Sequence, residues 1–391
     1  MKPNHTLMVL SSIFMMLLMG TVYAYSVFRY HIETLYQVNT LLSGVPYMTS
    51  LFFYACSMMI SGRFLKPNNL RRFVFYGTLL IVIGWFLSGI STTIYGLMLS
   101  YGVLIGSGVG MVYGVPIYMV QKLFPHKSGF MTGIILLGFG MSPLITAPLS
   151  SYLIEITSIR HTFFILGTIF LIIQLPLSYI FILREFKTFK QTPKEVMFKE
   201  KLKPFKRIYA LFVISTTVGL MMIGLTYQIG VRYYGMNETH VTIAISIFAV
   251  LNGIARPLFG KLMDIRGFKF TGSLSVLLII TSSLIGLINQ GSNFFLFGIS
   301  FGLYWFNLGA WLSIVPATIK EFYGIKQYSK KYGIMFTGYG IGAIIGTLVS
   351  GYILDILGRT IYIYGLILLL MIVSLIILSQ MPKKIKTPAG V

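Results

Sequence analysis

Uninterrupted apolar runs of about twenty residues recur along the whole sequence and constrain its fold more than any other feature. A helix rises about 1.5 Å per residue, so a run of this length crosses a hydrocarbon core of about 30 Å. Charged residues make up only 10% of the 391 positions, against roughly 25% in ordinary soluble domains. So few charges cannot cover a water-exposed surface, and we predict an all-α membrane protein.

Twelve such runs are bounded by charged or turn-forming residues. They lie at about 7–28, 43–62, 73–92, 96–121, 129–154, 162–183, 208–230, 240–262, 270–290, 294–319, 332–354 and 361–380. A polar segment separates the sixth run from the seventh. We therefore expect an N-terminal six-helix bundle at 1–183, a central cytoplasmic loop at 184–207 and a C-terminal six-helix bundle at 208–391.

The formal net charge of +22 could indicate a nucleic-acid partner, but the placement of the basic residues argues against it. Lys and Arg occupy short loops that are alternately rich and poor in positive charge, as the positive-inside rule requires. Of the 31 basic residues, 26 fall in segments predicted on one side of the membrane and four on the other. We predict a multi-pass protein of the cell membrane with both termini in the cytoplasm, surrounded by lipid and without a nucleic-acid partner.

Motifs of soluble enzymes and ATP-driven pumps are missing. The sequence contains no Gly-Lys-Ser or Gly-Lys-Thr phosphate-binding loop and no paired Cys or His spacing for a metal ion. Its single cysteine, Cys56, cannot form an intramolecular disulfide. We expect a monomer that is not an enzyme and that uses no cofactor and no metal.

Arg256 lies within the eighth apolar run, where a charged side chain costs at least about 2.5 kcal/mol. One explanation is that its guanidinium binds an anion in a central cavity, since its planar donors match a carboxylate. Asn252 lies one helical turn earlier and shares its face. The other explanation is that the side chain extends to the interface, because Met263 lies only about 10 Å further along the helix. We favour anion binding.

The two halves of the sequence resemble each other at matching places. Gly62-Arg63 and Gly260-Lys261 end the second and eighth runs. A parallel repeat of six spans around a central loop resembles the layout of the major facilitator superfamily. The segment Gly260-x-x-x-Asp264-x-x-Gly267 resembles the inner-loop motif of that superfamily, which implies a gating contact between Asp264 and a neighbouring helix end. The corresponding loop of the first half has Lys66 where the aspartate would stand.

Four stretches resemble the oxalate/formate antiporter family, whose relatives are the monocarboxylate transporters. These stretches are Gly20-Thr-Val-Tyr-Ala-Tyr-Ser-Val-Phe, Lys122-Leu-Phe-Pro-His-Lys-Ser-Gly, Asn252-Gly-Ile-Ala-Arg-Pro-Leu-Phe-Gly and Tyr332-Gly-Ile-Met-Phe-Thr-Gly-Tyr-Gly. The resemblance implies twelve transmembrane helices in two pseudo-symmetric bundles around a cavity that opens alternately to each side. It also implies that Arg256 pairs with a substrate carboxylate. The other positions that it places near substrate are Asn252, Tyr25, His31, Tyr113, Tyr118, Asn307, Trp311, Phe336 and Tyr339.

Tyr339 departs from the oxalate-specific pattern of that family, which has a lysine at the matching position. A dianion would therefore leave one carboxylate without a charged partner, at a cost of several kcal/mol in a desolvated site. A monocarboxylate such as lactate, pyruvate or formate fits one cation better. The alternatives are a carrier of oxalate or other dicarboxylates, a drug exporter, and a membrane sensor that transports nothing.

Proton coupling has two candidates, His31 and Glu33. All nine acidic residues fall in loops or at the ends of predicted helices, so the sequence offers no buried carboxylate as a proton relay. His31, near the outer end of the first run, could titrate near physiological pH, with an outer-surface position as the alternative. Glu33 is the weaker candidate. Exchange of one anion for another would need neither residue.

Overall fold

The computed structural model describes residues 5–66, 69–124, 127–180 and 204–381, and every regular element in these ranges is a helix. Within them, twelve spans are long and apolar enough to cross a membrane. This confirms the predicted all-α fold of twelve transmembrane helices. The predicted central loop falls largely on residues 181–203, outside the described residues.

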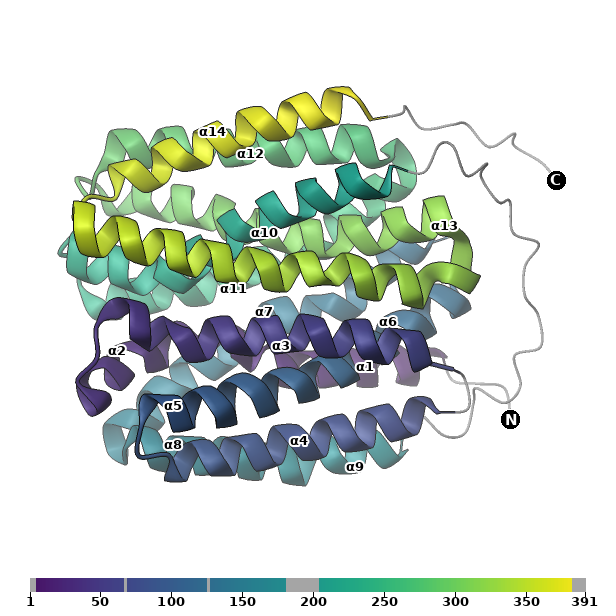
Figure 1. The fold of residues 1–391 in the computed structure, drawn as a ribbon, viewed down its shortest axis with the longest axis horizontal. Coiled ribbons are helices and arrows are strands. Elements are labelled where there is room, and N and C mark those ends of the chain that lie inside the picture. Colours follow the sequence, from purple (N-terminus) through teal and green to yellow (C-terminus); the bar gives the residue numbers. More distant parts are fainter. Residues whose placement is uncertain (1–4, 67–68, 125–126, 181–203, 382–391) are drawn as a thin grey trace.

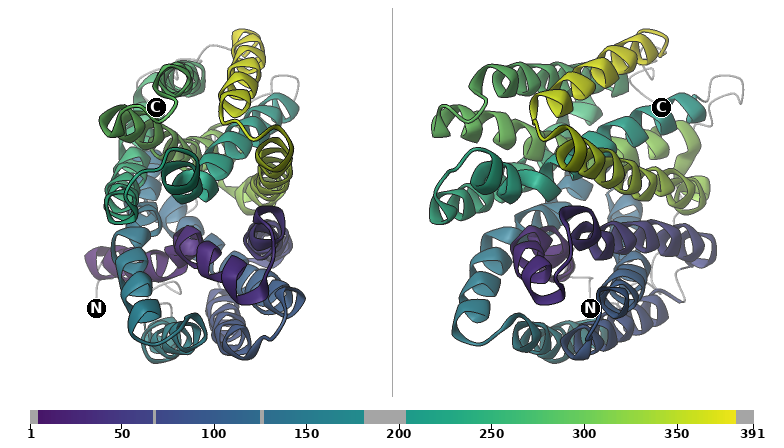
Figure 2. Two further views of the ribbon diagram at one scale, coloured as in Figure 1. Left: turned by 90° about the vertical axis from the view of Figure 1, so that its left-hand side faces the viewer. Right: turned by 60° about the vertical axis from the view of Figure 1, so that its left-hand side comes forward.

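Two bundles of six spans lie side by side (Figures 1 and 2). The N-terminal bundle contains α1 (His5–Met19), η1 (Gly20–Ala24), α2 (Tyr25–Tyr36), α3 (Thr40–Phe64), α4 (Leu70–Ile90), α5 (Ile94–Leu97), η2 (Met98–Ile105), α6 (Gly106–Leu123), α7 (Ser128–Ile156), α8 (Ile159–Ile169), η4 (Phe170–Gln174) and α9 (Leu175–Ile180). The C-terminal bundle contains α10 (Phe205–Gln228), η7 (Ile229–Tyr233), α11 (Glu238–Arg266), α12 (Phe268–Asn289), α13 (Phe294–Tyr352), η8 (Ile353–Leu357) and α14 (Ile361–Ser379). α13 supplies two spans, which meet at Gly324, whose φ of 68° breaks the helix.

The described chain begins in α1 and ends after α14 at the same end of the molecule, on the right in Figure 1. We call this the terminal end and the other the opposite end. Five helices that begin at the opposite end carry polar side-chain caps, because water or side chains must satisfy the first N–H groups of a helix. The backbone N–H groups donate these bonds to side-chain oxygens of the cap residues Asn39, Thr93, Ser158, Asn237 and Asn293.

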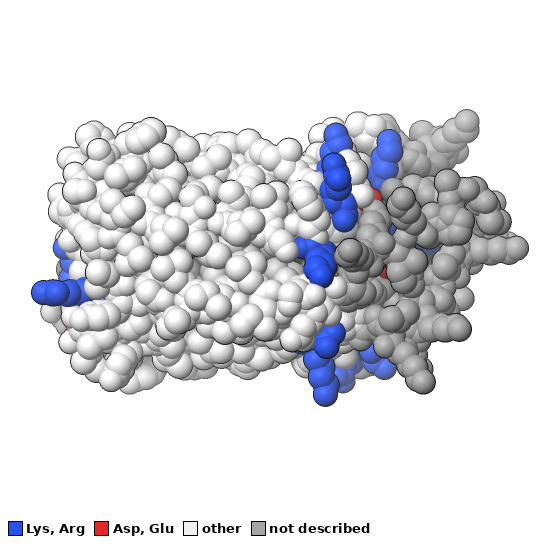
Figure 3. All heavy atoms as spheres, turned by 90° about the horizontal axis from the view of Figure 1, so that it is seen from above, with Lys and Arg blue, Asp and Glu red and all other residues white. Residues whose placement is uncertain are grey.

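The charged side chains bound an apolar belt. On the face drawn in Figure 3, Lys and Arg gather near the terminal end, few lie at the opposite end and none lies on the wide surface between them. An uncharged belt of this kind matches the hydrocarbon region of a bilayer. That the terminal end faces the cytoplasm remains a prediction from the positive-inside rule.

The two bundles meet along a seam, where α7 packs against α11 and α3 packs against the second span of α13. Glycines allow the backbones to touch. A Cβ atom at Gly133 would lie 2.4 Å from the carbonyl oxygen of Arg256, and one at Gly62 would lie 2.6 Å from that of Ser329. Because helices in lipid attract each other mainly through close van der Waals contact, these glycines hold the terminal half of the seam closed.

Candidate functional site

Arg256 reaches from α11 across the seam to α7. Its Nη1 donates to the carbonyl oxygen of Leu136 at 2.8 Å, and its Nη2 donates to Oδ1 of Asn252 at 2.9 Å. Nδ2 of Asn252 in turn donates to the carbonyl oxygen of Trp305 at 2.6 Å, which fixes the orientation of the amide. The guanidinium is 0% exposed, so it lies in the protein interior rather than at the membrane interface.

The guanidinium of Arg256 contacts only neutral groups among the described residues. Both of its hydrogen-bond acceptors are uncharged, and its buried Nε has no hydrogen-bond partner. The ring of Phe139 lies 5.5 Å from the guanidinium carbon and offers a weak cation–π contact. A buried charge without a counter-ion is costly. The site is therefore suited to an anion that enters from outside the protein.

Six aromatic side chains from both bundles pack on one another in a cluster that reaches the guanidinium through Phe139 and Tyr23, and we call them the aromatic cage. They are Tyr23, Tyr54, Tyr113, Phe139, Phe336 and Tyr339. Phe139 contacts Tyr23 and Tyr113 with ring centroids 5.1 and 5.4 Å apart. Phe336 closes the ring from the C-terminal bundle, 5.5 Å from Tyr113 and 4.9 Å from Tyr339. The cage therefore joins helices that must separate whenever the seam opens.

Tyr339 occupies the position at which the oxalate-specific pattern has a lysine. Its hydroxyl forms a hydrogen bond of 2.8 Å with the hydroxyl of Tyr23. The Tyr23 hydroxyl also lies beside the Arg256 guanidinium. The cage thus presents one formal charge and several neutral donors. Among the predicted substrate positions, the structure brings together Arg256, Asn252, Tyr113, Phe336 and Tyr339.

Asn307 and Trp311 lie elsewhere. Oδ1 of Asn307 accepts a hydrogen bond from Oγ of Ser275 on α12 at 2.7 Å. The Trp311 ring packs against Phe268, also on α12, with ring centroids 6.2 Å apart. Both predicted residues therefore face α12 inside the C-terminal bundle, and in this conformation the structure does not place them with the cage.

Tyr25 and Tyr118 are also outside the cage. The Tyr25 hydroxyl donates to the carbonyl oxygen of Ser43 at 2.7 Å, and its ring stacks on Tyr47 at 5.4 Å. These contacts place Tyr25 inside the N-terminal bundle toward the opposite end. Tyr118 is half-buried on α6, five residues beyond the cage residue Tyr113.

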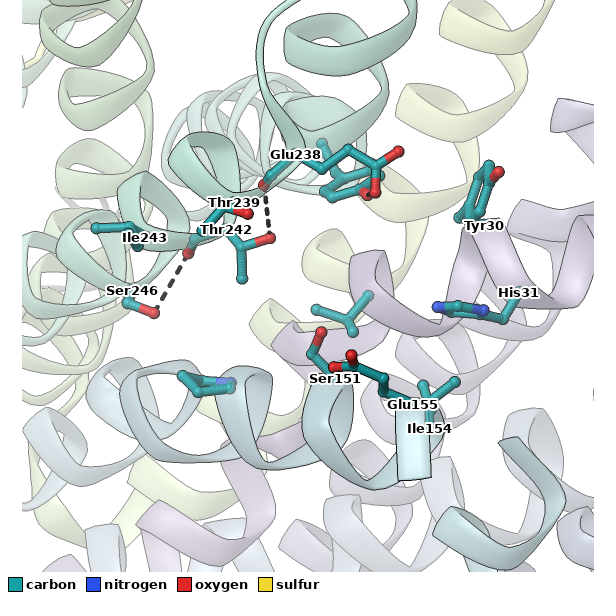
Figure 4. A pocket seen from close by; sticks show the side chains of 13 residues that line it. Tyr30, His31, Ser151, Ile154, Glu155, Glu238, Thr239, Thr242, Ile243 and Ser246 are labelled. Atoms are coloured by element: carbon teal, nitrogen blue, oxygen red, sulfur yellow. Dashed lines mark hydrogen bonds between the residues drawn. The ribbon is translucent and has the colours of Figure 1, made fainter. Parts of the chain in front are cut away.

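His31 lines a polar pocket of about 620 Å³ at the opposite end, formed by α2, α7, α10 and α11. Figure 4 shows His31 and Glu155 of the N-terminal bundle facing Glu238 of the C-terminal bundle across this pocket. The Tyr227 hydroxyl donates to Oε2 of Glu238 at 3.0 Å. His31 is therefore half-buried beside water-accessible space and remote from the cage.

Arg29 and Glu33 form a polar network across the seam at the opposite end, which the sequence did not indicate. The first helical span continues to Tyr36, beyond its predicted end, and buries Arg29 to 6% exposure. Arg29 donates from Nη1 to the carbonyl oxygen of Gly224 on α10 at 3.0 Å. Oε1 of Glu33 accepts from Oγ of Ser43 at 2.7 Å and from Nε2 of Gln228 at 2.9 Å. Glu33 lies in the last turn of α2, at a helix end as expected from the sequence, and its hydrogen-bond partners lie on α3 and α10.

Asp264 binds the start of α7 at the terminal end. Its carboxylate accepts from the backbone N–H groups of Gly129 and Phe130 at 3.2 and 3.0 Å. Gly260, one turn earlier, lets the helices approach, since a Cβ there would lie 2.3 Å from the carbonyl oxygen of Gly129. Gly267 ends α11 with a φ of 76°, which favours glycine. The geometry is that of a carboxylate at a helix N-terminus, and its gating role remains a prediction.

Two cage tyrosines, Tyr23 and Tyr54, were not singled out from the sequence. In a chain with 25 Tyr and 31 Phe, composition distinguishes no single aromatic residue. Tyr23 lies within the Gly20–Phe28 stretch that carried the family resemblance, which was a usable signal. Tyr54 lies in an ordinary apolar run, and only the packing of α3 against α6 and α13 brings it to the cage.

Comparison with known proteins relates this chain to a family of membrane proteins. The sequence model of the Major Facilitator Superfamily matches residues 7–230 and 208–391. The oxalate:formate antiporter of Oxalobacter formigenes is 23% identical over 361 residues, covering 87% of this chain and 84% of the antiporter. Monocarboxylate transporter 9 of Rattus norvegicus is 22% identical over 412 residues, covering 81% of this chain and 79% of the transporter. The crystal structure of the human organic anion transporter MFSD10 (TETRAN) matches with a TM-score of 0.68 at 11% identity, covering 96% of this chain and 100% of that one.

Proposed function

This chain belongs to the major facilitator superfamily, and we propose that it transports a small monocarboxylate by alternating access, with Arg256 as the anchor for the carboxylate. The single observation that carries the proposal is the buried guanidinium of Arg256, which faces the other bundle and has no described carboxylate as a partner. An entering carboxylate would supply the missing negative charge, because its two oxygens match the donors of a guanidinium.

The cage favours a substrate with one charge and a small remainder. Tyr339 and Tyr23 pair with each other and contribute no second cation. A second carboxylate would therefore be desolvated without an ionic partner, at a cost of several kcal/mol. The hydroxyl or apolar remainder of lactate, pyruvate or formate needs only the neutral donors and rings of the cage.

Two relatives that are named for small carboxylates support a carboxylate substrate, although one of the two names includes the dicarboxylate oxalate. One is an oxalate:formate antiporter and another a monocarboxylate transporter, and both match more than three quarters of this chain. We propose a location in the cell membrane, both termini in the cytoplasm and a monomeric unit. For coupling, we propose either proton symport, with His31 or Glu33 at the opposite end as candidates, or exchange of anions.

Arg256→Gln tests the proposal, with Arg359→Gln as a matched control at an exposed arginine of the opposite end. Purified protein is screened for thermal stabilisation by formate, lactate, pyruvate and oxalate, since a ligand of the folded state raises its apparent stability. Uptake is then measured in proteoliposomes. Removing one partner of a buried charge pair costs about 2–5 kcal/mol, so binding should weaken at least about 30-fold in Arg256→Gln and stay unchanged in the control.

Two outcomes would contradict the proposal. Full uptake by a well-folded Arg256→Gln protein, judged by gel filtration and by its unliganded melting point, would remove Arg256 from the binding site. Stronger stabilisation by oxalate than by any monocarboxylate would contradict the argument from a single charge.

A further inference from the structure

Three buried tyrosine hydroxyls, in or on the terminal side of the aromatic cage, have no hydrogen-bond partner in the described structure: those of Tyr113, Tyr328 and Tyr332. Their side chains are at most 2% exposed. The Tyr332 hydroxyl lies close to that of Tyr113, but without the geometry of a hydrogen bond. Buried polar groups are nearly always paired, because a lost hydrogen bond to water is costly. Three unpaired donors in one region indicate a binding site for a ligand that accepts hydrogen bonds.

The side chains of Tyr328, Tyr332 and Phe336 form a ladder along one face of α13. The Tyr328 and Tyr332 rings stack with centroids 5.4 Å apart, and Tyr332 meets Phe336 at 5.7 Å. Each step spans one helical turn. Phe336 belongs to the cage, and Tyr328 lies one residue after the start of its span at the terminal end. By helical rise the ladder covers about 12 Å between the cage and that end.

The ladder lies along the seam between the bundles. Tyr113 belongs to α6 of the N-terminal bundle, whereas Tyr328 and Tyr332 belong to α13 of the C-terminal bundle. The residues that follow the two ladder tyrosines, Ser329 and Gly333, touch α3. A Cβ at Gly62 would lie 2.6 Å from the Ser329 carbonyl oxygen, and one at Gly333 would lie 3.1 Å from that of Met58. Separation of α3 from α13 would therefore uncover the hydroxyls beside the opening.

We propose that Tyr113, Tyr328 and Tyr332 form a second anion subsite, which receives the carboxylate on the terminal side of Arg256 during transit. The proposal rests on the proposed function. The three O–H groups would donate to the carboxylate while it sheds or regains water at the narrow opening. Phenols carry no charge, so they lower the barrier without trapping the anion. A conduction path needs binding that is strong enough for entry and weak enough for release.

Tyr332→Phe and Tyr328→Phe test this subsite in full-length protein, because each removes one hydroxyl and keeps the ring. Tyr101→Phe is the matched control. Tyr101 is also fully buried with an unpartnered hydroxyl, but it packs beside Tyr25 inside the N-terminal bundle. Two quantities are measured with formate and lactate: the initial rate of uptake into proteoliposomes, and the concentration that gives half-maximal thermal stabilisation.

We expect the uptake rate of each ladder variant to fall about tenfold, because each variant loses one hydrogen bond to a charged group. The concentration of substrate that gives half-maximal thermal stabilisation should change less than about twofold. The double variant should lose more, and Tyr101→Phe should match the wild type in both measurements. Since removal of an unpartnered buried hydroxyl does not harm packing, the unliganded melting point should not fall.

The opposite results overturn the inference. Uptake by both ladder variants at the wild-type rate would show that the hydroxyls serve no transit step. Equal losses of uptake and binding would place them in the Arg256 site and remove the second subsite. A wild-type protein that neither binds nor carries formate or lactate would instead refute the proposed function, whatever the ladder variants do.

Discussion

Asp264→Asn tests whether a single carboxylate helps to hold the terminal end of the seam closed. The carboxylate accepts two backbone N–H bonds from the start of α7, and each bond to a charged group contributes about 1.5–3 kcal/mol. A charge at a helix N-terminus adds about 0.3–1 kcal/mol. Asparagine keeps one neutral acceptor, and the site is only partly buried, so we take about 2 kcal/mol as the loss.

A loss of about 2 kcal/mol shifts the equilibrium between closed and open terminal ends about 30-fold. If the open form is about 1% of the wild-type population, it should rise to about a quarter in the variant. Lys320 lies close enough to interact with Asp264, so removing the negative charge also leaves this lysine without that neighbour. Lys320 and Asp264 belong to the same bundle, so we attribute the expected opening to the weakened bonds across the seam to α7.

The shift can be measured as a distance between spin labels. Phe64 ends α3 and is 61% exposed, and Lys330 is exposed near the start of the last span of α13. Cysteines at these two positions, on a Cys56→Ala background, report the separation of the bundles by double electron–electron resonance. Glu155→Gln is the control, because it removes an exposed carboxylate at the opposite end. Identical distance distributions for Asp264→Asn and wild type would refute the reasoning.

Two further predictions concern packing and the opposite end. Gly110→Ala should lower the melting point in detergent by the equivalent of about 1–3 kcal/mol, because its Cβ would lie 2.2 Å from the Tyr54 carbonyl oxygen. Gly114→Ala on the same helix, with nothing within 4 Å, should not lower it, and equal melting points would contradict this account. Glu33→Gln should weaken the bonds to Ser43 and Gln228 by about 1–2 kcal/mol and so favour opening of the opposite end. The opening would be detected as a longer distance between spin labels on α2 and α11. An unchanged distance would show that this network does not hold the opposite end closed.

The number of spans and the family were predictable from the sequence because both rest on local properties. A helix in lipid satisfies its own backbone hydrogen bonds, so each apolar run identifies itself without reference to the rest of the chain. Arg256 was identified in the same way, since a charge inside such a run is unusual wherever its neighbours lie. The inner-loop motif around Asp264 predicted a contact with a helix end, and the structure shows one with the first turn of α7.

The direction in which each helix faces could not be predicted as reliably. Trp311 and Asn307 were expected near substrate, yet they face α12, whereas Tyr54 reaches the cage from an unremarkable run. The rotation of a helix about its axis depends on the side chains that it meets on helices far away in the sequence. In a chain that is apolar on almost every face, hydropathy carries little information about that rotation.

The sequence by itself therefore determined the membrane setting, the twelve spans, the repeat and the unusual charge of Arg256 inside a span. The membrane setting, the spans and the unusual charge each follow from the cost of placing a residue in lipid. Only the tertiary structure decided which aromatic rings surround Arg256, that Glu33 bonds across the seam, and that the hydroxyls of Tyr328 and Tyr332 lie unpaired beside it. These features arise where two bundles touch, and such contacts depend on shape complementarity between surfaces that no local pattern encodes.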